Sequence, residues 1–159
     1  MGDPATGDLR SGWVVVELHA DETHALRRTV LRDHTAESDV DYPTDHWPGT
    51  FHLGVRDRRG RVVAVASFAV EPAPGHPDRH AVRLRGMAVD RAHQGAGLGT
   101  RIMDEAMRRL RDDGTALCWA NARTTALAFY RQRGFEPVGD EFDSVGLTHI
   151  VVVLDLEQD

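Results

Sequence analysis

The most informative stretch of this chain is QGAGLGT, residues Gln94–Thr100. It follows the apolar run Gly86–Val89 and opens a strongly periodic helix. Because glycine has no Cβ, the backbone of such a loop can approach a ligand closely. The start of a helix adds unpaired N–H groups and a partial positive charge. The stretch therefore predicts a cradle for a phosphate or pyrophosphate group.

Predicted strands and helices alternate on both sides of this stretch. Strands are expected at Trp13–Leu18, Phe51–Val55, Arg61–Val70, Ala81–Val89, Thr115–Ala120, Phe135–Val138 and Leu147–Leu156. Helices are expected at Asp21–Asp33, at Gly97–Asp112, and from Thr124 or Thr125 to Arg133. Residues 36–50 and 71–79 contain several prolines and are expected to form loops. This order predicts a mixed α/β domain.

Length and composition place the chain among ordinary globular proteins. Its 159 residues suit one domain, which we expect at residues 13–159, preceded by a flexible tail at residues 1–12. No apolar run approaches the ~18–20 residues that a membrane span needs. The net charge of −6 argues against a nucleic-acid partner. We therefore expect a cytoplasmic protein that binds neither membrane nor nucleic acid.

Cys118 is the only cysteine, which excludes an internal disulfide and a metal cluster built on cysteines. It falls in a predicted strand, so we expect a buried and inert thiol. The histidines show no zinc-type spacing, such as two of them four residues apart on one helix. The sequence therefore predicts no metal site.

A second motif follows the glycine stretch. The two motifs together are more specific than the glycine stretch alone. It consists of Ala126, the aromatic pair Phe129–Tyr130, and Gly134–Phe135. The two motifs resemble the signatures of the GNAT N-acetyltransferase superfamily, Gln/Arg-x-x-Gly-x-Gly/Ala and Asn-x-x-Ala-x-x-aromatic-Tyr followed by Gly-Phe. The residues that match the first signature are Gln94, Gly97 and Gly99. The resemblance is good over about residues 84–138.

The resemblance implies a mixed α/β fold with a mostly antiparallel central sheet, flanking helices, and a parallel, splayed strand pair at the cofactor site. It also implies transfer of an acetyl group from acetyl-CoA, as co-substrate, to a primary amine of a small molecule or a protein. The amine would attack directly in a ternary complex. A non-catalytic domain that binds CoA or acyl-CoA as a sensor or interaction module is the alternative, and a homodimer stays open. A nucleotide-binding protein fits less well, because the stretch lacks the Lys-Ser/Thr ending of a P-loop.

The resemblance also implies which residues contact the cofactor. The loop binds the pyrophosphate, the strand before it pairs with the pantetheine arm, and a backbone N–H of that strand faces the thioester carbonyl. The implied cofactor-binding residues are Met87, Ala88, Val89, Gln94, Gly95, Ala96, Gly97, Leu98, Gly99, Thr100, Asn121, Arg123 and Phe129. Arg123 stands where the family often has asparagine, and the nearest asparagine is Asn121. Which of the two contacts the cofactor stays open.

Three residues are candidates for proton transfer. Tyr130 matches the tyrosine of the second motif and is expected to protonate the departing thiolate. His149 and Glu141 are candidates for the base that takes a proton from the attacking amine, and Glu141 is expected to begin a loop. Further candidates for the base are His34, Glu37, Glu71 and His80. The acidic residues expected to attract a cationic acceptor are Glu37, Asp39, Asp41 and Asp45.

Overall fold

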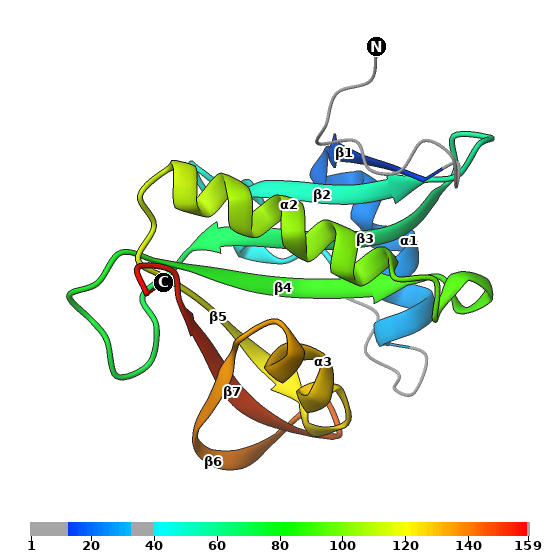
Figure 1. The fold of residues 1–159 in the computed structure, drawn as a ribbon. Coiled ribbons are helices and arrows are strands. Elements are labelled where there is room, and N and C mark those ends of the chain that lie inside the picture. The colour runs from blue at the N-terminus through cyan, green and yellow to red at the C-terminus, as the bar shows by residue number, and fades with distance from the viewer. Residues whose placement is uncertain (1–12, 33–39, 159) are drawn as a thin grey trace. The chain divides into compact units, whose positions relative to one another are not determined.

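A computed structural model describes residues 13–32 and 40–158. Its strands form one seven-stranded sheet in the order β1-β2-β3-β4-β5-β7-β6 (Figure 1). The strands are β1 (Val14–Leu18), β2 (Phe51–Arg56), β3 (Val62–Val70), β4 (Ala81–Val89), β5 (Leu117–Arg123), β6 (Glu136–Ser144) and β7 (Leu147–Asp155). The β4–β5 pair is parallel, whereas β1–β2, β2–β3, β5–β7 and β6–β7 are antiparallel. The predicted mixed, mostly antiparallel α/β fold is confirmed.

The chain divides into two compact units, which we describe separately. The first comprises residues up to 69 together with 86–109, and the second comprises 70–85 together with residues from 110 onward. Strand β4 therefore contributes its first part to the second unit and its last part to the first unit. The single domain expected at residues 13–159 stays a prediction. Some predicted features lie outside the described residues, namely the tail at 1–12, His34, Glu37 and Asp39.

In the first unit, the strands β1, β2 and β3 form an antiparallel meander with an aliphatic core. The centre of this core consists of Leu18, Val65 and Ala88. Side chains from the helical segment before β2 pack against it, namely Leu26, Val30 and Leu31. Burying an aliphatic side chain of this size contributes about 1.5–3 kcal/mol. The end of β4, which carries Ala88, is therefore anchored in the core of this unit.

Helix α2 (Leu98–Asp112) confirms the helix predicted after the glycine stretch. Its buried residues recur at helical spacing and include Leu98, Ile102, Met103 and Ala106. Arg109 donates hydrogen bonds to Glu105 at 3.1 Å and to Glu17 of β1 at 2.7 Å. These contacts tie α2 to the first strand.

The helix predicted at Asp21–Asp33 is wrong in type and in limits. The structure has a 3-10 turn at Ala20–Thr23, a short helix α1 (His24–Leu26) and a π turn at Arg27–Leu31. The π turn begins at Arg27. The side chain of this arginine is fully buried, whereas an arginine of an amphipathic helix is expected on the polar, solvent-facing side. Such wide turns are uncommon, and they often accompany functional sites.

In the second unit, β5 pairs with the first part of β4 and with β7, and β7 pairs with β6. Trp119 is buried in a cluster with small and aliphatic side chains, namely Ala73, Ala81, Ala116 and Leu117. Helix α3 (Leu127–Gln132) follows a 3-10 turn at Thr124–Ala126. None of the helices within the described part of the chain is long and apolar enough to cross a membrane.

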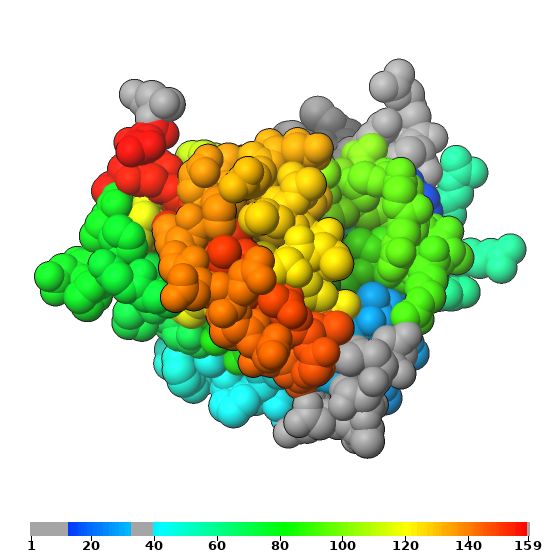
Figure 2. Space-filling model, turned by 90° about the horizontal axis from the view of Figure 1, so that it is seen from below, coloured from blue at the N-terminus to red at the C-terminus, as the bar shows by residue number. Residues whose placement is uncertain are grey.

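Two predicted strands of this unit have wrong limits. Strand β5 starts at Leu117 and runs to Arg123, so the residues up to Arg123 extend the sheet. Strand β6 runs on to Ser144, so Glu141 lies in a strand and does not begin a loop. The strand is irregular after Val138. Its side chains are mostly exposed, and Figure 2 shows this segment, in orange, at the surface.

Candidate active site

The glycine loop of the first unit is open to solvent. Gly95 and Gly97 have φ values of +88° and +80°, in the left-handed region that favours glycine. A Cβ built on either residue would meet no atom within 4 Å. The backbone conformation, and not packing within the protein, therefore requires glycine at both positions. The loop leaves its main chain accessible to a ligand.

The N-terminus of α2 adds a field that favours an anion. Its first turn carries no acidic side chain that would neutralise the partial positive charge. Leu98 is buried and anchors this end of the helix. The first N–H groups of a helix have no acceptor within it, and here the N–H of Arg101 already donates to Gly97 at 3.1 Å. The N–H groups of residues 98–100 are thus available to a phosphate.

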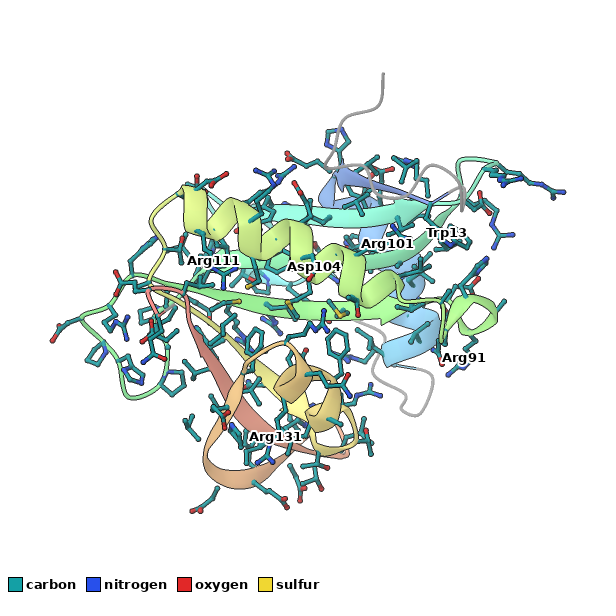
Figure 3. The ribbon with its side chains drawn as sticks, in the orientation of Figure 1. Trp13, Arg91, Arg101, Asp104, Arg111 and Arg131 are labelled. Carbon is teal, nitrogen blue, oxygen red and sulfur yellow. The ribbon has the colours of Figure 1, made fainter. Side chains whose placement is uncertain are left out.

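The side chain of Gln94 stabilises the loop. Its Nε2 donates a hydrogen bond to the carbonyl oxygen of Val89 at 3.0 Å, which ties the loop to the end of β4. Two arginines that the sequence analysis did not single out come from the turn before the loop and from α2 (Figure 3). These are Arg91, which donates to the carbonyl oxygen of Thr29 at 2.9 Å, and Arg101. Their charges add to the attraction that the helix exerts on an anion.

Strand β4 turns at Gly86, just before the residues predicted to pair with pantetheine. Gly86 has a φ of +64°, which breaks the extended conformation of the strand. The residue pairs of the β4–β5 ladder end at Arg83, so Met87–Val89 lie outside this ladder. The side chain of Ala88 is buried in the core. The side chain thus fixes the strand, while the main chain of Met87–Val89 remains the candidate for ligand contacts.

A buried network around Arg27 lies beside Gly86, and the sequence did not reveal it. The Nη1 group donates to Asp45 Oδ2 at 2.7 Å and to the carbonyl oxygen of Val40 at 2.7 Å. The Nη2 group donates to Asp45 Oδ1 at 2.9 Å and to Ser67 Oγ at 2.7 Å. Burial raises the pKa of Asp45, but the hydrogen bonds and charge of Arg27 outweigh burial, so the pKa lies below its ordinary value. Asp45 is therefore a buried ion-pair partner and does not belong to an exposed acidic loop.

His52 completes this network as a neutral group. Ser67 Oγ accepts from Arg27, so its O–H can donate to His52 Nδ1 at 2.6 Å. The Nε2–H of His52 then donates to the carbonyl oxygen of Asp45 at 3.3 Å. Burial lowers the pKa of His52 below its ordinary value of 6.5 and outweighs the hydrogen bond and the charge of Asp45, which raise it.

The neutral state of His52 gives a pH dependence of folding. Below pH 6.5, the ordinary pKa, His52 binds a proton in the unfolded chain. In the folded chain it stays neutral until the pH falls further, because its pKa is lowered. Stability from this site is therefore present above that pH and is lost as the pH falls through the folded-state pKa. We expect urea denaturation to show a shallower fall of the free energy of unfolding below this pH in His52→Asn than in the wild type. An equal fall in both proteins would contradict this assignment. His46→Asn changes an exposed histidine and is the control, so the free energy of unfolding should fall as steeply as in the wild type.

In the second unit, α3 places Tyr130 among aromatic rings. Phe129 and Phe135 each contact it edge-to-face, with ring centroids 5.4 Å away. Burial, with Cys118 nearby, raises the pKa of the Tyr130 hydroxyl. The hydroxyl is therefore protonated at neutral pH, as in an ordinary tyrosine, and is a weaker acid than an ordinary tyrosine.

His149 is 8% exposed and has a defined tautomer. Its Nδ1 lies 2.9 Å from the carbonyl oxygen of Leu147, which can only accept, so Nδ1 carries a proton. In the neutral ring, Nε2 then holds the lone pair that a base needs. The His149 ring stacks on the Phe142 ring, with 5.8 Å between the ring centroids. Arg123 of β5 lies directly opposite His149 in the sheet, and Asn121 shares the same face.

The other candidates for the base are placed less favourably. Glu141 is exposed in β6, and His80 is exposed before β4. The carboxylate of Glu71 accepts a hydrogen bond from Arg83 at 3.2 Å, so one of its oxygens is already paired with a positive charge. Asp41 is not a candidate for the base but one of the acidic residues expected to attract a cationic acceptor, and its Oδ1 lies 2.9 Å from His46 Nε2.

One group of side chains has the spacing of metal ligands. Ligand atoms of His24, Asp41 and Asp45 lie within 4.8 Å of one another. Both carboxylate oxygens of Asp45, however, accept hydrogen bonds from the positively charged Arg27. This charge opposes a cation, so the group does not fit a metal. The absence of a metal site stays a prediction.

Comparisons with known proteins agree with this arrangement. The model of the acetyltransferase (GNAT) family matches residues 16–135. The uncharacterised N-acetyltransferase YitI of Bacillus subtilis (strain 168) is 32% identical over 139 residues, which are 87% of this chain and 93% of that protein.

Solved structures share the fold at lower identity. Escherichia coli ElaA has a TM-score of 0.75 and 19% identity, over 90% of this chain and 99% of its own. YhbS of Escherichia coli, solved in complex with CoA, has a TM-score of 0.69 and 22% identity, over 98% of this chain and 85% of its own. Because the family model covers most of the described residues and YitI matches along nearly its whole length, the chain belongs to the GNAT acetyltransferase family and is an acyltransferase.

Proposed function

We propose that this acyltransferase moves an acetyl group from acetyl-CoA to a primary amine. The observation that carries the proposal is the exposed glycine loop that leads into the N-terminus of α2, with no acidic side chain in the first turn. These features suit a pyrophosphate, and Arg91 and Arg101 add positive charge. YhbS has the same fold and was solved with CoA, and we extend that class of ligand to this chain.

The backbone and the side chains have different roles in this proposal. Main-chain groups of Met87–Val89 bind the amides of the pantetheine arm, and one N–H stabilises the oxygen of the thioester carbonyl as the amine attacks. Asn121, Arg123 and Phe129 contribute further contacts to the cofactor. The N-acetyltransferase name of YitI supports an amine as the acceptor.

Transfer occurs directly in the ternary complex. Cys118 is buried, and burial raises the pKa of its thiol to about 12. A thiol with this pKa is not a thiolate at neutral pH, so it does not serve as an acyl carrier. The amine therefore attacks the thioester itself, and the C–S bond breaks as the new C–N bond forms.

A two-step experiment tests the function. Thermal denaturation with and without acetyl-CoA measures binding, and release of free thiol from acetyl-CoA measures transfer to a panel of amines. The panel holds polyamines, amino acids, aminoglycosides and peptides with free N-termini. Stabilisation together with amine-dependent thiol release supports the enzyme. Stabilisation without turnover for any amine favours the CoA-binding sensor, and no stabilisation contradicts both.

Tyr130→Phe should slow the chemical step. The change keeps the buried ring and its contacts with Phe129 and Phe135 and removes only the hydroxyl that protonates the departing sulfur. We expect kcat to fall about 10- to 100-fold, with little change in affinity for acetyl-CoA. Steady-state kinetics and calorimetric titration check the two quantities. An unchanged kcat, with chemistry shown to limit the rate, would make Tyr130 a packing residue.

His149→Ala should remove a limb of the pH profile. Only a neutral imidazole can accept a proton on Nε2, so a base at His149 gives the wild-type rate a limb that rises with pH. The variant should lose this limb, and kcat/KM measured against pH shows it. His76→Ala, on a half-buried histidine of the same unit, is the control and should keep the limb. A normal profile in His149→Ala would shift the role to Glu141.

A further inference from the structure

One donor of the Arg27 guanidinium has no hydrogen bond to any residue of 13–32 or 40–158. The four N–H groups of Nη1 and Nη2 all have acceptors, which are Val40, Asp45 and Ser67. The Nε–H has no partner among the described residues, although Arg27 is 0% exposed. A buried donor without a partner is uncommon and costs stability. The group that lies in front of Nε is therefore informative.

That group is the backbone at Gly86. A Cβ built on Gly86 would lie 2.8 Å from Arg27 Nε and 3.2 Å from Tyr42 Cε2. The ring of Tyr42 packs on the guanidinium, with its centroid 3.9 Å from Arg27 Cζ. The guanidinium thus occupies the space that a side chain at position 86 would need. Glycine is required here for this close approach as well as for its φ of +64°.

The guanidinium that packs on Gly86 is rigid. Its partners belong to three segments, because Val40 precedes the 3-10 turn at Pro43–His46, Asp45 lies in that turn, and Ser67 belongs to β3. A planar arginine fork with a bidentate carboxylate has little freedom to move. The turn of β4 therefore rests on a fixed group, whereas a flexible side chain could yield.

We propose that Arg27 is a positioning residue for acyl transfer. Its guanidinium braces the turn of β4 at Gly86 and so sets the direction of the backbone amides of Met87–Val89. This inference rests on the proposed function, in which those amides bind pantetheine and the thioester oxygen. Without the brace the amides shift, and a misplacement of about 1 Å costs up to about 100-fold in rate.

Arg27→Lys is the first test variant. Lysine keeps the charge next to Asp45, but it lacks the fork and the Nε that packs on Gly86. We expect turnover of acetyl-CoA, followed as free thiol with the most active amine of the panel, to fall about 10- to 100-fold. The affinity for CoA, measured by calorimetry, should fall by a smaller factor than turnover does, because the pantetheine contacts of Met87–Val89 weaken while the glycine loop that binds the pyrophosphate is untouched. Hydrogen exchange of the Met87–Val89 amides should be faster than in the wild type.

Arg56→Lys is the matched control. Arg56 belongs to β2, is partly exposed, and donates single hydrogen bonds to Glu22 Oε2 at 2.8 Å and to the carbonyl oxygen of Gly60 at 3.1 Å, so the same substitution is made at an arginine of this unit that does not contact Gly86. Turnover and the exchange of the Met87–Val89 amides should remain as in the wild type. The same slowing in this variant would mean that any change of arginine to lysine disturbs the unit, which overturns a specific role for Arg27.

Gly86→Ala tests the same contact from the other side. The added methyl group collides with Arg27 Nε while every charged partner of the network is kept. We expect the same signature as for Arg27→Lys, namely slower turnover, a smaller loss of affinity for CoA and faster exchange at Met87–Val89. If Arg27→Lys does not fold, Gly86→Ala alone tests whether the contact between Arg27 and Gly86 positions the Met87–Val89 amides. Unchanged turnover and exchange in a folded variant overturn the inference and leave the proposed function intact. A wild type that fails to bind CoA overturns the proposed function instead, whatever the exchange rates show.

Discussion

Gly97→Glu will abolish the thermal stabilisation that acetyl-CoA gives to the wild-type chain. At a concentration of about 100 times Kd, a ligand stabilises the folded state by about 2.7 kcal/mol, which for a chain of this size raises Tm by about 5–10 °C. The glutamate side chain occupies the open space over the loop and repels the pyrophosphate. Differential scanning fluorimetry with and without acetyl-CoA measures the shift.

Gly60→Glu is a closely matched control for this change. Gly60 has a φ of +83°, and a Cβ there also meets no atom within 4 Å, as at Gly97. The control therefore carries the same charge and the same backbone strain, about 1–2 kcal/mol for a residue with a Cβ. It should start from a similarly lowered Tm and keep the full shift with acetyl-CoA. If Gly97→Glu keeps the shift as well, the loop is not the cofactor site.

The loop could be predicted from sequence because its signals are local. The glycines, the apolar strand before them and the periodic helix after them are consecutive in the chain. Each signal constrains the next, since the strand must end before the turn and the turn must precede the helix. The structure confirms these elements with limits close to those expected.

Strand β6 could not be delimited from sequence, for a physical reason. It pairs with β7 on one side only, and most of its side chains are exposed, so it needs no alternation of apolar residues. The turn that follows it consists of Val145 and Gly146, with φ values of +47° and +76°. Valine is rare in this conformation, so nothing in the sequence marks the turn. The acidic residues before it were therefore interpreted as a loop.

The Arg27 network was missed because its partners are distant in the chain. Arg27 bonds to Val40, Asp45 and Ser67, which are 13, 18 and 40 residues away. Periodicity describes the faces of one segment and carries no information on such pairings. An arginine in a predicted amphipathic helix is expected on the solvent side, whereas here it is fully buried. The tautomer of His149 likewise depends on a carbonyl contact that only coordinates reveal.

Asp45→Asn should destabilise the fold strongly. The amide keeps the shape of the carboxylate but removes the charge that pairs with the buried Arg27. Removing one partner of a buried ion pair leaves the other without compensation and costs about 3–5 kcal/mol. For a chain of this size, Tm should fall by about 6–20 °C. Glu17→Gln, at an exposed pair with Arg109, is the control and should cost at most about 1 kcal/mol.

The pH dependence of this loss identifies its cause. The pKa of Asp45 lies below its ordinary value of 3.8, so the stability from its charge is present above that pH and is lost as the pH falls through the folded-state pKa. Urea denaturation should therefore show a constant difference between wild type and Asp45→Asn near neutral pH. The difference should shrink as the pH falls below 3.8 and through the folded-state pKa, where the wild type also loses the charge. A difference that stays constant over this range would assign the loss to the geometry of the amide and not to the missing charge. A loss as small as that of Glu17→Gln would mean that the buried charge of Arg27 is compensated without Asp45, which contradicts the ion pair as the cause of the expected destabilisation.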